Sequence, residues 1–232
     1  GAGGGAALGA AASCCRCFLR SRPFFTGIQS SSSAPAAGAG DGGEDYVNPV
    51  TALLGRFIPK PEEVVIDGVD FAAAKTPLAL PAMAEALDAG LREREWFVTG
   101  RVLPNLFADG FEFKDPDVQL TGIDTYASGV ARLFDDDARC EVISCEPAAD
   151  GARRVEVEWR LSGGVKVGPG LTFKPYVVYT DLRLDDAGLV DFQEDRFSVP
   201  GWQILLGAVA PWLPVPEPAP PADELRARKA AT

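Results

Sequence analysis

The residue types that could carry out chemistry are limited in this chain of 232 residues, which contains no histidine, five cysteines and 33 Asp and Glu residues. Without an imidazole, a Ser-His-Asp triad, a Cys-His pair and a His-containing metal site are all excluded. Carboxylates remain, and they act as general bases near neutral pH when burial raises their pKa and a Tyr or Arg side chain supports them. Enzymatic chemistry, if the chain has any, is expected to centre on a carboxylate.

The cysteines form no recognisable metal or disulfide pattern. Cys14, Cys15 and Cys17 are clustered, but without a second cysteine pair or a histidine the usual four-ligand zinc sites cannot be completed locally. Cys140 and Cys145 lie on one predicted strand at a spacing that points their side chains to opposite faces. They are expected to be buried thiols, and no metal site is predicted.

Two further motifs do not support a cofactor. The Asp135–Asp137 triplet follows a predicted helix, and a solvated turn is favoured there over a metal site because the helix dipole disfavours anions at a C-terminus. The glycines from Gly163 to Gly170 follow a strand but open no helix, so they lack the setting of a phosphate-binding loop. No cofactor is predicted. The net charge of −11 also argues against nucleic acid as a partner, because such binding depends on Lys and Arg.

Residues 1–40 differ from the rest of the chain in charge. They hold three arginines and no Asp or Glu, among many Ala, Gly and Ser residues. This composition is typical of an organellar transit peptide, so we expect a plastid location, with the mitochondrion and a plain low-complexity tail as alternatives. Removing those three arginines from the 22 basic residues leaves 19 against 33 acidic ones, so the body carries a net charge of −14.

Helical spacing dominates the first part of the body. Residues 41–77 are interpreted as a linker with a short apolar helix, which either docks on the domain surface or anchors the chain to a membrane or partner. The apolar side chains of this helix are Val50, Leu53, Leu54 and Phe57. Further helices are predicted at 83–97, 105–109 and 122–134.

Alternating patterns typical of strands come later in the chain. Residues 153–161 are the clearest example, because one predicted face carries only apolar side chains, namely Val155, Val157, Trp159 and Leu161. Other strands are predicted at 111–113, 139–146, 171–184 and 189–199, joined mainly by Asp- and Gly-containing turns. Helices followed by hairpin-linked strands predict an α+β fold and not an alternating βαβ one.

One segment carries a resemblance to a known superfamily. It begins with Trp96-Phe97, continues through Leu-Phe-Ala-Asp-Gly-Phe-Glu-Phe-Lys-Asp-Pro at 106–116, and ends with Gly122 and Tyr126. This pattern resembles the start of the SnoaL-like, or nuclear-transport-factor-2-like, fold. More narrowly, it is similar to the plastid family called domain of unknown function 2358. The resemblance covers residues 80–200 and implies a cone, at 78–200, of N-terminal helices packed on a curved antiparallel sheet around a pocket.

The resemblance also implies candidate site residues. Catalytic members of the superfamily use a His/Asp pair, an Asp/Tyr pair or an Asp-Arg-Asp arrangement, and the first is impossible here. The candidate catalytic residues are Asp115, Tyr126, Asp181, Asp195 and Arg196, and the candidate ligand-binding residues are Phe113, Tyr126, Trp159 and Tyr179. Simpler interpretations stay open, with Asp115 as a turn residue, Trp159 as core, and Asp195 and Arg196 as members of separate surface pairs.

Residues 201–232 are interpreted as an apolar segment and a proline-rich, charged and mobile tail. The apolar segment is too short to span a bilayer. It could cover an open face of the domain, contact a membrane through 202–213, or contact another subunit. The candidate interface residues are Trp202, Leu205, Leu206 and Trp212, together with Leu53, Leu54 and Phe57 of the earlier apolar helix.

Fold alone does not select a function for such a chain. The leading hypothesis is a non-catalytic plastid protein that binds a small apolar ligand or serves as an accessory subunit of a larger, membrane-associated photosynthetic assembly. The alternative is an isomerase, cyclase or hydrolase that uses an Asp general base with a Tyr or Arg partner. The alternative requires Asp115, Asp181 or Asp195 to project into the enclosed interior beside such a partner, and it fails if all three face solvent.

Overall fold

The computed structural model describes residues 45–46, 65–166 and 170–231. The chain divides into two units, 1–40 and 41–232, and the first lies wholly outside the described residues. The predicted leader, the three clustered cysteines, and the predicted apolar helix with Leu53, Leu54 and Phe57 therefore also lie outside them.

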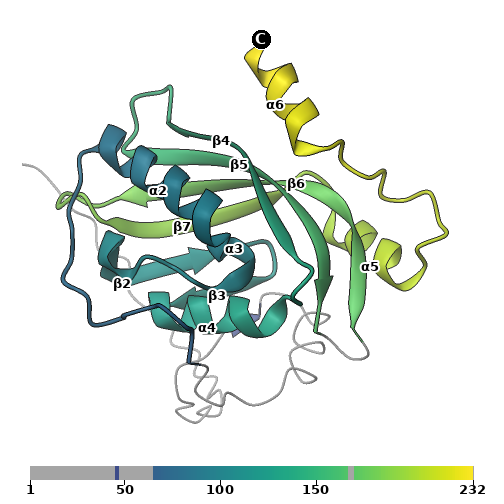
Figure 1. Cartoon of the computed structure of the whole chain (residues 1–232), viewed down its shortest axis with the longest axis horizontal. Helices are drawn as coiled ribbons and strands as arrows, with labels where there is room; N and C mark the ends of the chain where they lie inside the picture. The colour runs from purple at the N-terminus through teal and green to yellow at the C-terminus, as the bar shows by residue number, and fades with distance from the viewer. Residues whose placement is uncertain (1–44, 47–64, 167–169, 232) are drawn as a thin grey trace, which may run out of the picture. The chain divides into compact units, whose positions relative to one another are not determined.

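The described part of that unit is built on one curved sheet (Figure 1). Its spatial order is β1-β3-β2-β7-β6-β5-β4. The strands are β1 (Asp45–Tyr46), β2 (Phe107–Lys114), β3 (Val118–Thr121), β4 (Arg139–Pro147), β5 (Arg154–Val165), β6 (Leu171–Leu184) and β7 (Val190–Phe197). Neighbouring strands are antiparallel except for β2 and β7, which are parallel. The predicted α+β cone is confirmed, with a mixed sheet in place of a fully antiparallel one.

The parallel pair follows from the route of the chain. After the β2–β3 hairpin, helix α4 (Ile123–Leu133) carries the chain to β4 at the far edge of the sheet. Strands β4 to β7 then return as a meander, so that β7 reaches β2 in the same direction. Parallel neighbours need such a long crossover, whereas antiparallel ones can be joined by a tight turn.

Helices cover the inner face of this sheet. Helix α2 (Leu80–Arg94) packs mainly against β4, and α4 packs against the short helix α3 (Trp96–Thr99) and against β2 and β3. Figure 1 shows α2 crossing the sheet and α4 running below β3. The helix predicted at 83–97 is broken at Glu95, which has a φ of 49° and whose Oε2 accepts a 2.9 Å hydrogen bond from Cys140 N. A contact between distant segments therefore accompanies the break.

The helix predicted at 105–109 is wrong beyond its first turn. Only a 3-10 helix, Pro104–Leu106, forms there, and Phe107 begins β2. Along β2 the side chains of Phe107, Phe111 and Phe113 are buried, while most residues between them are exposed or intermediate. Pairing with β7 and burial of these rings outweigh the local helical tendency, and context commonly overrides such weak propensities.

A β-bulge corrects the prediction that Cys140 and Cys145 face opposite sides. The β4–β5 register shifts between Val142 and Ser144, so one extra residue is inserted between the two cysteines. Cys140 then lies opposite Leu161 and Cys145 opposite Val157, and both partners belong to the buried face of β5. Burial raises the pKa of Cys145 to about 12 and raises the pKa of Cys140 well above its usual range, and both are free thiols.

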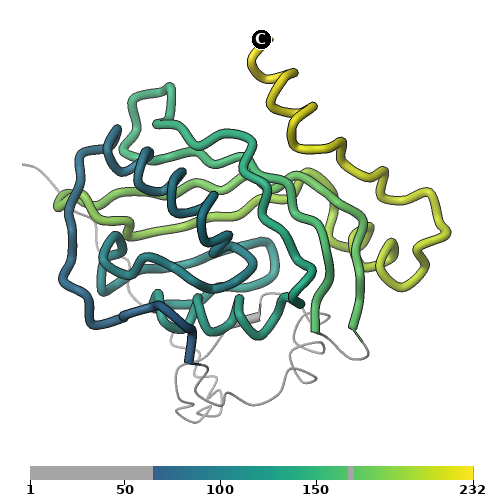
Figure 2. Tube along the Cα trace, in the orientation of Figure 1, coloured from purple at the N-terminus to yellow at the C-terminus, as the bar shows by residue number. Residues whose placement is uncertain are grey.

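The C-terminal tail also differs from its prediction. Residues predicted to be mobile form helix α6 (Ala222–Ala230), which packs against β4. Figure 2 shows the coil of this segment next to the C-terminus. Arg226 donates from Nε and Nη2 to Val142 O at 2.9 and 2.7 Å, and Lys229 Nζ lies 2.9 Å from Glu158 Oε2. The apolar segment forms helix α5 (Gly201–Val209) against β6. None of the described helices is long and apolar enough to cross a bilayer.

Candidate functional site

Two neighbouring strands bring a hydroxyl and a carboxyl together in the interior. Thr180 of β6 is paired with Asp195 of β7, and both side chains point to the face that carries the core. Thr180 Oγ1 donates a 2.7 Å hydrogen bond to Asp195 Oδ1. Trp159 of β5 donates from Nε1 to Thr180 Oγ1 at 3.0 Å. Three adjacent strands thus contribute to one chain of hydrogen bonds.

Gln193 extends this chain to the helices. Its Nε2 donates to Asp195 Oδ1 at 3.1 Å and to the Tyr126 hydroxyl of α4 at 3.3 Å. Because the side chains of Gln193 and Asp195 are two positions apart on β7, they lie on the same face of the strand. We call the series Trp159, Thr180, Asp195, Gln193 and Tyr126 the interior polar chain.

Aromatic rings surround the interior polar chain. The ring centroid of Phe113 lies 4.9 Å from that of Tyr126, and the Phe97 centroid lies 5.1 Å from that of Trp159. Phe111 also contacts Tyr126, edge to face, at 6.0 Å. These rings are buried, so the polar chain lies in an apolar environment. Buried polar groups in such a setting are tolerated when they are hydrogen-bonded to one another.

Burial raises the pKa of the Asp195 carboxyl group. Gln193 and Thr180 are fully buried, while Asp195 keeps 9% of its surface exposed. Desolvation raises the pKa of Asp195 to about 7, against the opposing effect of the hydrogen bonds from Thr180 and Gln193. Desolvation also raises the pKa of Tyr126 well above its usual range. Asp195 therefore exchanges its proton near neutral pH, whereas Tyr126 stays protonated.

Two oxygen atoms of the interior polar chain accept no hydrogen bond from any group in the described part of the structure. Both donors to Asp195 reach Oδ1, and no described side chain or backbone group donates to Oδ2. Gln193 Oε1 is buried and has no partner among the described residues. A buried acceptor without a donor is costly, so these oxygens are suited to a bound molecule that carries a hydrogen-bond donor.

Asp115 lies apart from the interior polar chain. Its Oδ1 accepts hydrogen bonds from the backbone N of Asp117 at 2.7 Å and of Val118 at 2.6 Å, in the turn between β2 and β3. Desolvation still raises the pKa of Asp115, against these two bonds, and its charge contributes to the raised pKa of Asp195. The structure thus places Asp115 as a turn residue that acts on Asp195 only through its electrostatic field.

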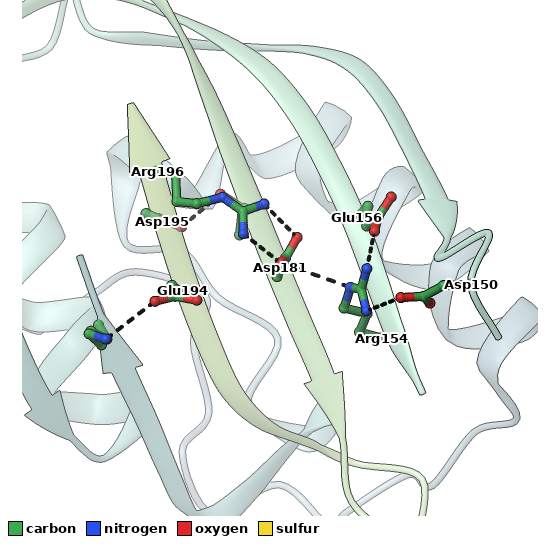
Figure 3. A network of polar contacts seen from close by, with 9 residues as sticks. Asp150, Arg154, Glu156, Asp181, Glu194, Asp195 and Arg196 are labelled. Carbon is green, nitrogen blue, oxygen red and sulfur yellow. Dashed lines mark hydrogen bonds and ion pairs between the residues drawn. The ribbon is translucent and has the colours of Figure 1, made fainter. Parts of the chain in front are cut away.

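Asp181, Arg196 and Tyr179 lie on the outer face of the sheet, away from Asp195. Arg196 donates to Asp181 from Nη1 and Nη2 at 3.0 and 3.2 Å, and Figure 3 shows this pair in a network that continues to Arg154. Tyr179 is 40% exposed. The alternation of strand side chains separates Asp195 from its neighbour Arg196, so Arg196 donates to Asp181 and acts on Asp195 only through its charge, which opposes the rise in the pKa of Asp195.

The structure thus brings together some of the predicted site residues and separates others. Asp195, Tyr126, Trp159 and Phe113 meet in the interior. Thr180 and Gln193, which were not among the predicted site residues, belong to the same interior group. The signal available was a polar residue on an otherwise apolar face, as Thr180 is between Val178 and Leu182. Within the described residues no cluster of three or more potential metal ligands occurs.

Comparisons with known proteins concern the fold. No protein-family model matches the chain, and no curated protein does, so the narrower plastid family stays a prediction. Several solved structures are similar, among them a hypothetical protein with a ketosteroid isomerase-like fold from Catenulispora acidiphila, with 19% identity, a TM-score of 0.40, and coverage of 62% of this chain and 96% of that one. These structures include SnoaL-like and nuclear-transport-factor-2-like proteins.

Some of these similar structures have names that state an activity. A putative SnoaL-like polyketide cyclase from Jannaschia shows 14% identity and a TM-score of 0.42, over 64% of this chain and 100% of that one. An epoxide hydrolase-like protein from M. tuberculosis shows 18% identity and a TM-score of 0.37, over 56% and 89%. At such identities and TM-scores these likenesses carry no functional argument, and function has to be argued from the side chains of the site.

Proposed function

We propose that the protein binds a small, largely apolar molecule in its cone and exchanges a proton with it through Asp195. The observation that carries this proposal is the state of that carboxyl. It is buried, its pKa is raised to about 7, and its Oδ1 is held by Thr180 and Gln193 while Oδ2 has no donor among the described groups. A general acid or base works best with a pKa near the working pH and a fixed position.

The proton transfer follows from this arrangement. In its charged form, Asp195 removes a proton from a C–H or O–H group of the bound molecule, and the electron pair of the broken bond stays on that molecule. The carboxyl can then return the proton to a second atom, which is an isomerisation, or to a leaving group. Thr180 and Gln193 stabilise the carboxylate, and the surrounding rings favour an apolar substrate.

The test uses nitrobenzisoxazole, a small apolar probe of protein bases. Removal of its ring proton breaks the N–O bond and releases a coloured phenolate, so the rate is read by absorbance. The full chain should accelerate the opening, with a rate that rises through a pH of about 7. Asp195→Asn should lower the rate about a hundredfold, because the base is lost while the side-chain shape is kept.

Asp191→Asn is the matched control. Asp191 lies on the same strand, is ion-paired with Arg183 at 2.9 Å, and takes no part in the interior polar chain. Its substitution should leave the rate unchanged. Equal rates for the native chain and Asp195→Asn would overturn the proton-transfer proposal.

A second candidate is ligand binding or assembly without turnover, in a plastid and as an accessory subunit of a photosynthetic complex. Close packing of the interior favours assembly over ligand binding within this candidate, since Trp159 and Tyr126 are each only 3% exposed and Gln193 is fully buried. Native mass spectrometry of the purified full chain would identify a retained ligand. A retained ligand together with no Asp195-dependent opening of nitrobenzisoxazole would select this candidate over the first.

The plastid location rests on residues 1–40, whose lack of Asp and Glu is typical of transit peptides. Fusion of this segment to a fluorescent reporter in plant cells would test it. Import into plastids is the expected result, import into mitochondria would select the alternative, and a cytosolic reporter would contradict both.

A further inference from the structure

Helix α5 and the residues after it present an apolar stripe to solvent. The stripe consists of Trp202, Leu205, Leu206, Val209 and Trp212. Trp202 is 62% exposed, Val209 53% and Trp212 79%, and the two leucines are partly buried. Trp202 and Val209 are two helical turns apart and therefore share one face of α5. Large apolar side chains rarely gather on a protein surface without a binding role.

The side of α5 opposite the apolar stripe packs against the rest of the domain. Ile204 and Ala208, on the other side of α5, pack against the core. Gly207 is buried, and a Cβ atom there would lie 2.7 Å from Cδ of Pro216, so the chain after the helix folds back closely onto it. Lys174 of β6 donates from Nζ to Leu213 O and, at 3.4 Å, to Val215 O. These contacts fix the stripe as a surface that faces outwards.

The absence of charged residues indicates which kind of partner the apolar stripe contacts. No Lys, Arg, Asp or Glu occurs from Pro200 to Pro216, in a chain of which 24% is charged. A protein interface commonly has a polar rim that makes specific hydrogen bonds around its apolar centre. An uncharged helix with tryptophans near both ends instead fits the boundary between lipid headgroups and acyl chains.

We propose that the apolar stripe docks the protein on the surface of a neutral lipid bilayer. The net charge of −11 disfavours attraction to anionic lipids, so docking depends on insertion of Trp202, Val209 and Trp212 among neutral headgroups. The helix lies on the surface and does not span the bilayer, since α5 has only nine residues.

Docking also suggests the class of substrate. Helix α5 packs against β6, where Tyr176 contacts Phe197 at 5.8 Å between ring centroids, and Phe197 is two positions from Asp195 on β7. The bilayer would thus lie at the end of the cone that is next to the carboxyl group of Asp195. This step rests on the proposed function, and it indicates a lipid-soluble substrate. The docking itself does not require Asp195.

Flotation of the full chain with phosphatidylcholine vesicles tests the proposal. The native chain should float with the vesicles, and the double variant Trp202→Ser/Trp212→Ser should lose about tenfold or more of its partitioning. The single variant Phe71→Ser is the control, because it removes a 38% exposed aromatic ring outside the stripe and should change nothing. Asp195→Asn should float like the native chain, which separates docking from the proposed proton transfer.

Further measurements distinguish apolar docking from attraction between charges. Flotation should not weaken at high salt and should not improve when phosphatidylglycerol is added, because no charge attraction is involved. If the double variant does not fold, Val209→Lys tests the same stripe with a single exposed substitution. Absence of flotation, equal flotation of the stripe variants, or light scattering that shows a dimer lost in the variants would each overturn membrane docking, the last in favour of a second copy of the chain.

Discussion

The hydroxyl of Thr180 donates a 2.7 Å hydrogen bond to Oδ1 of Asp195. A hydroxyl has a single proton, and Trp159 Nε1 already donates to Thr180 Oγ1, so the Thr180 proton is directed at the carboxyl. Gln193 donates to the same oxygen. The exchangeable proton of Asp195 is therefore expected on Oδ2.

Asp195→Asn should remove a pH dependence of stability. The folded pKa of about 7 exceeds the ordinary value of 3.8, so the folded chain binds more protons than the unfolded chain between these values. The free energy of unfolding should then fall as pH rises from about 4 to about 7, by roughly 4 kcal/mol as an upper bound for three pKa units. Urea unfolding across this range measures the effect. The Asn variant should lack it, and an equal pH slope in both chains would contradict the assignment.

Thr180→Val should raise the pKa of Asp195 further and destabilise the fold. The hydrogen bond from Thr180 favours the charged carboxylate, so its loss favours the protonated form. Trp159 Nε1 also loses its acceptor, which costs about 1–3 kcal/mol for a buried donor. Thr180→Ser keeps the hydroxyl and should behave like the native chain. Urea midpoints together with the NMR titration of Asp195 would decide, and identical results for Val and Ser would exclude the role given to the hydroxyl.

Gly100→Ala should destabilise the packing of α3 on α4. Gly100 has a φ of 71°, and a Cβ atom there would lie 2.3 Å from Ala127 O. The expected loss exceeds about 2 kcal/mol, because backbone strain and a clash with backbone add together. Gly151→Ala is the control, since its φ is 78° but nothing lies within 4 Å of the added Cβ atom, so about 1 kcal/mol is expected. Similar losses at both positions, measured by thermal unfolding, would argue against the close approach.

Arg226→Ala should loosen helix α6 from the sheet. Arg226 donates twice to Val142 O, beside the β-bulge of β4 where the strand register is interrupted. A loss of about 1–3 kcal/mol is expected for a hydrogen bond from a charged group. Arg226→Lys keeps the charge but cannot donate two hydrogen bonds to Val142 O from one planar group, so it should recover only part of the lost stability. Hydrogen exchange of α6 amides gives the readout, and unchanged protection in Arg226→Ala would contradict the contact.

Local patterns accounted for most of the elements. Period-two alternation predicted β5, β6 and β7, and the stripe of apolar residues predicted most of α2 and α4. These patterns work because one face of each element is buried, and burial imposes the period of the backbone. Short or interrupted elements were missed, including β3 and helix α6. Their residues are fixed by partners far away in sequence, such as Val142 for Arg226.

The candidate site shows the same division. The sequence by itself determined that no imidazole chemistry is possible, that helices pack on a sheet, and that the side chains of Asp195 and Arg196 point to opposite faces of their strand. It could not decide which face is the interior, because both faces of β6 and β7 carry polar residues. Only the tertiary structure placed Thr180, Gln193 and Asp195 inside and Asp181 with Arg196 outside. The raised pKa of Asp195 depends on that placement, since desolvation requires the surrounding elements to exclude water.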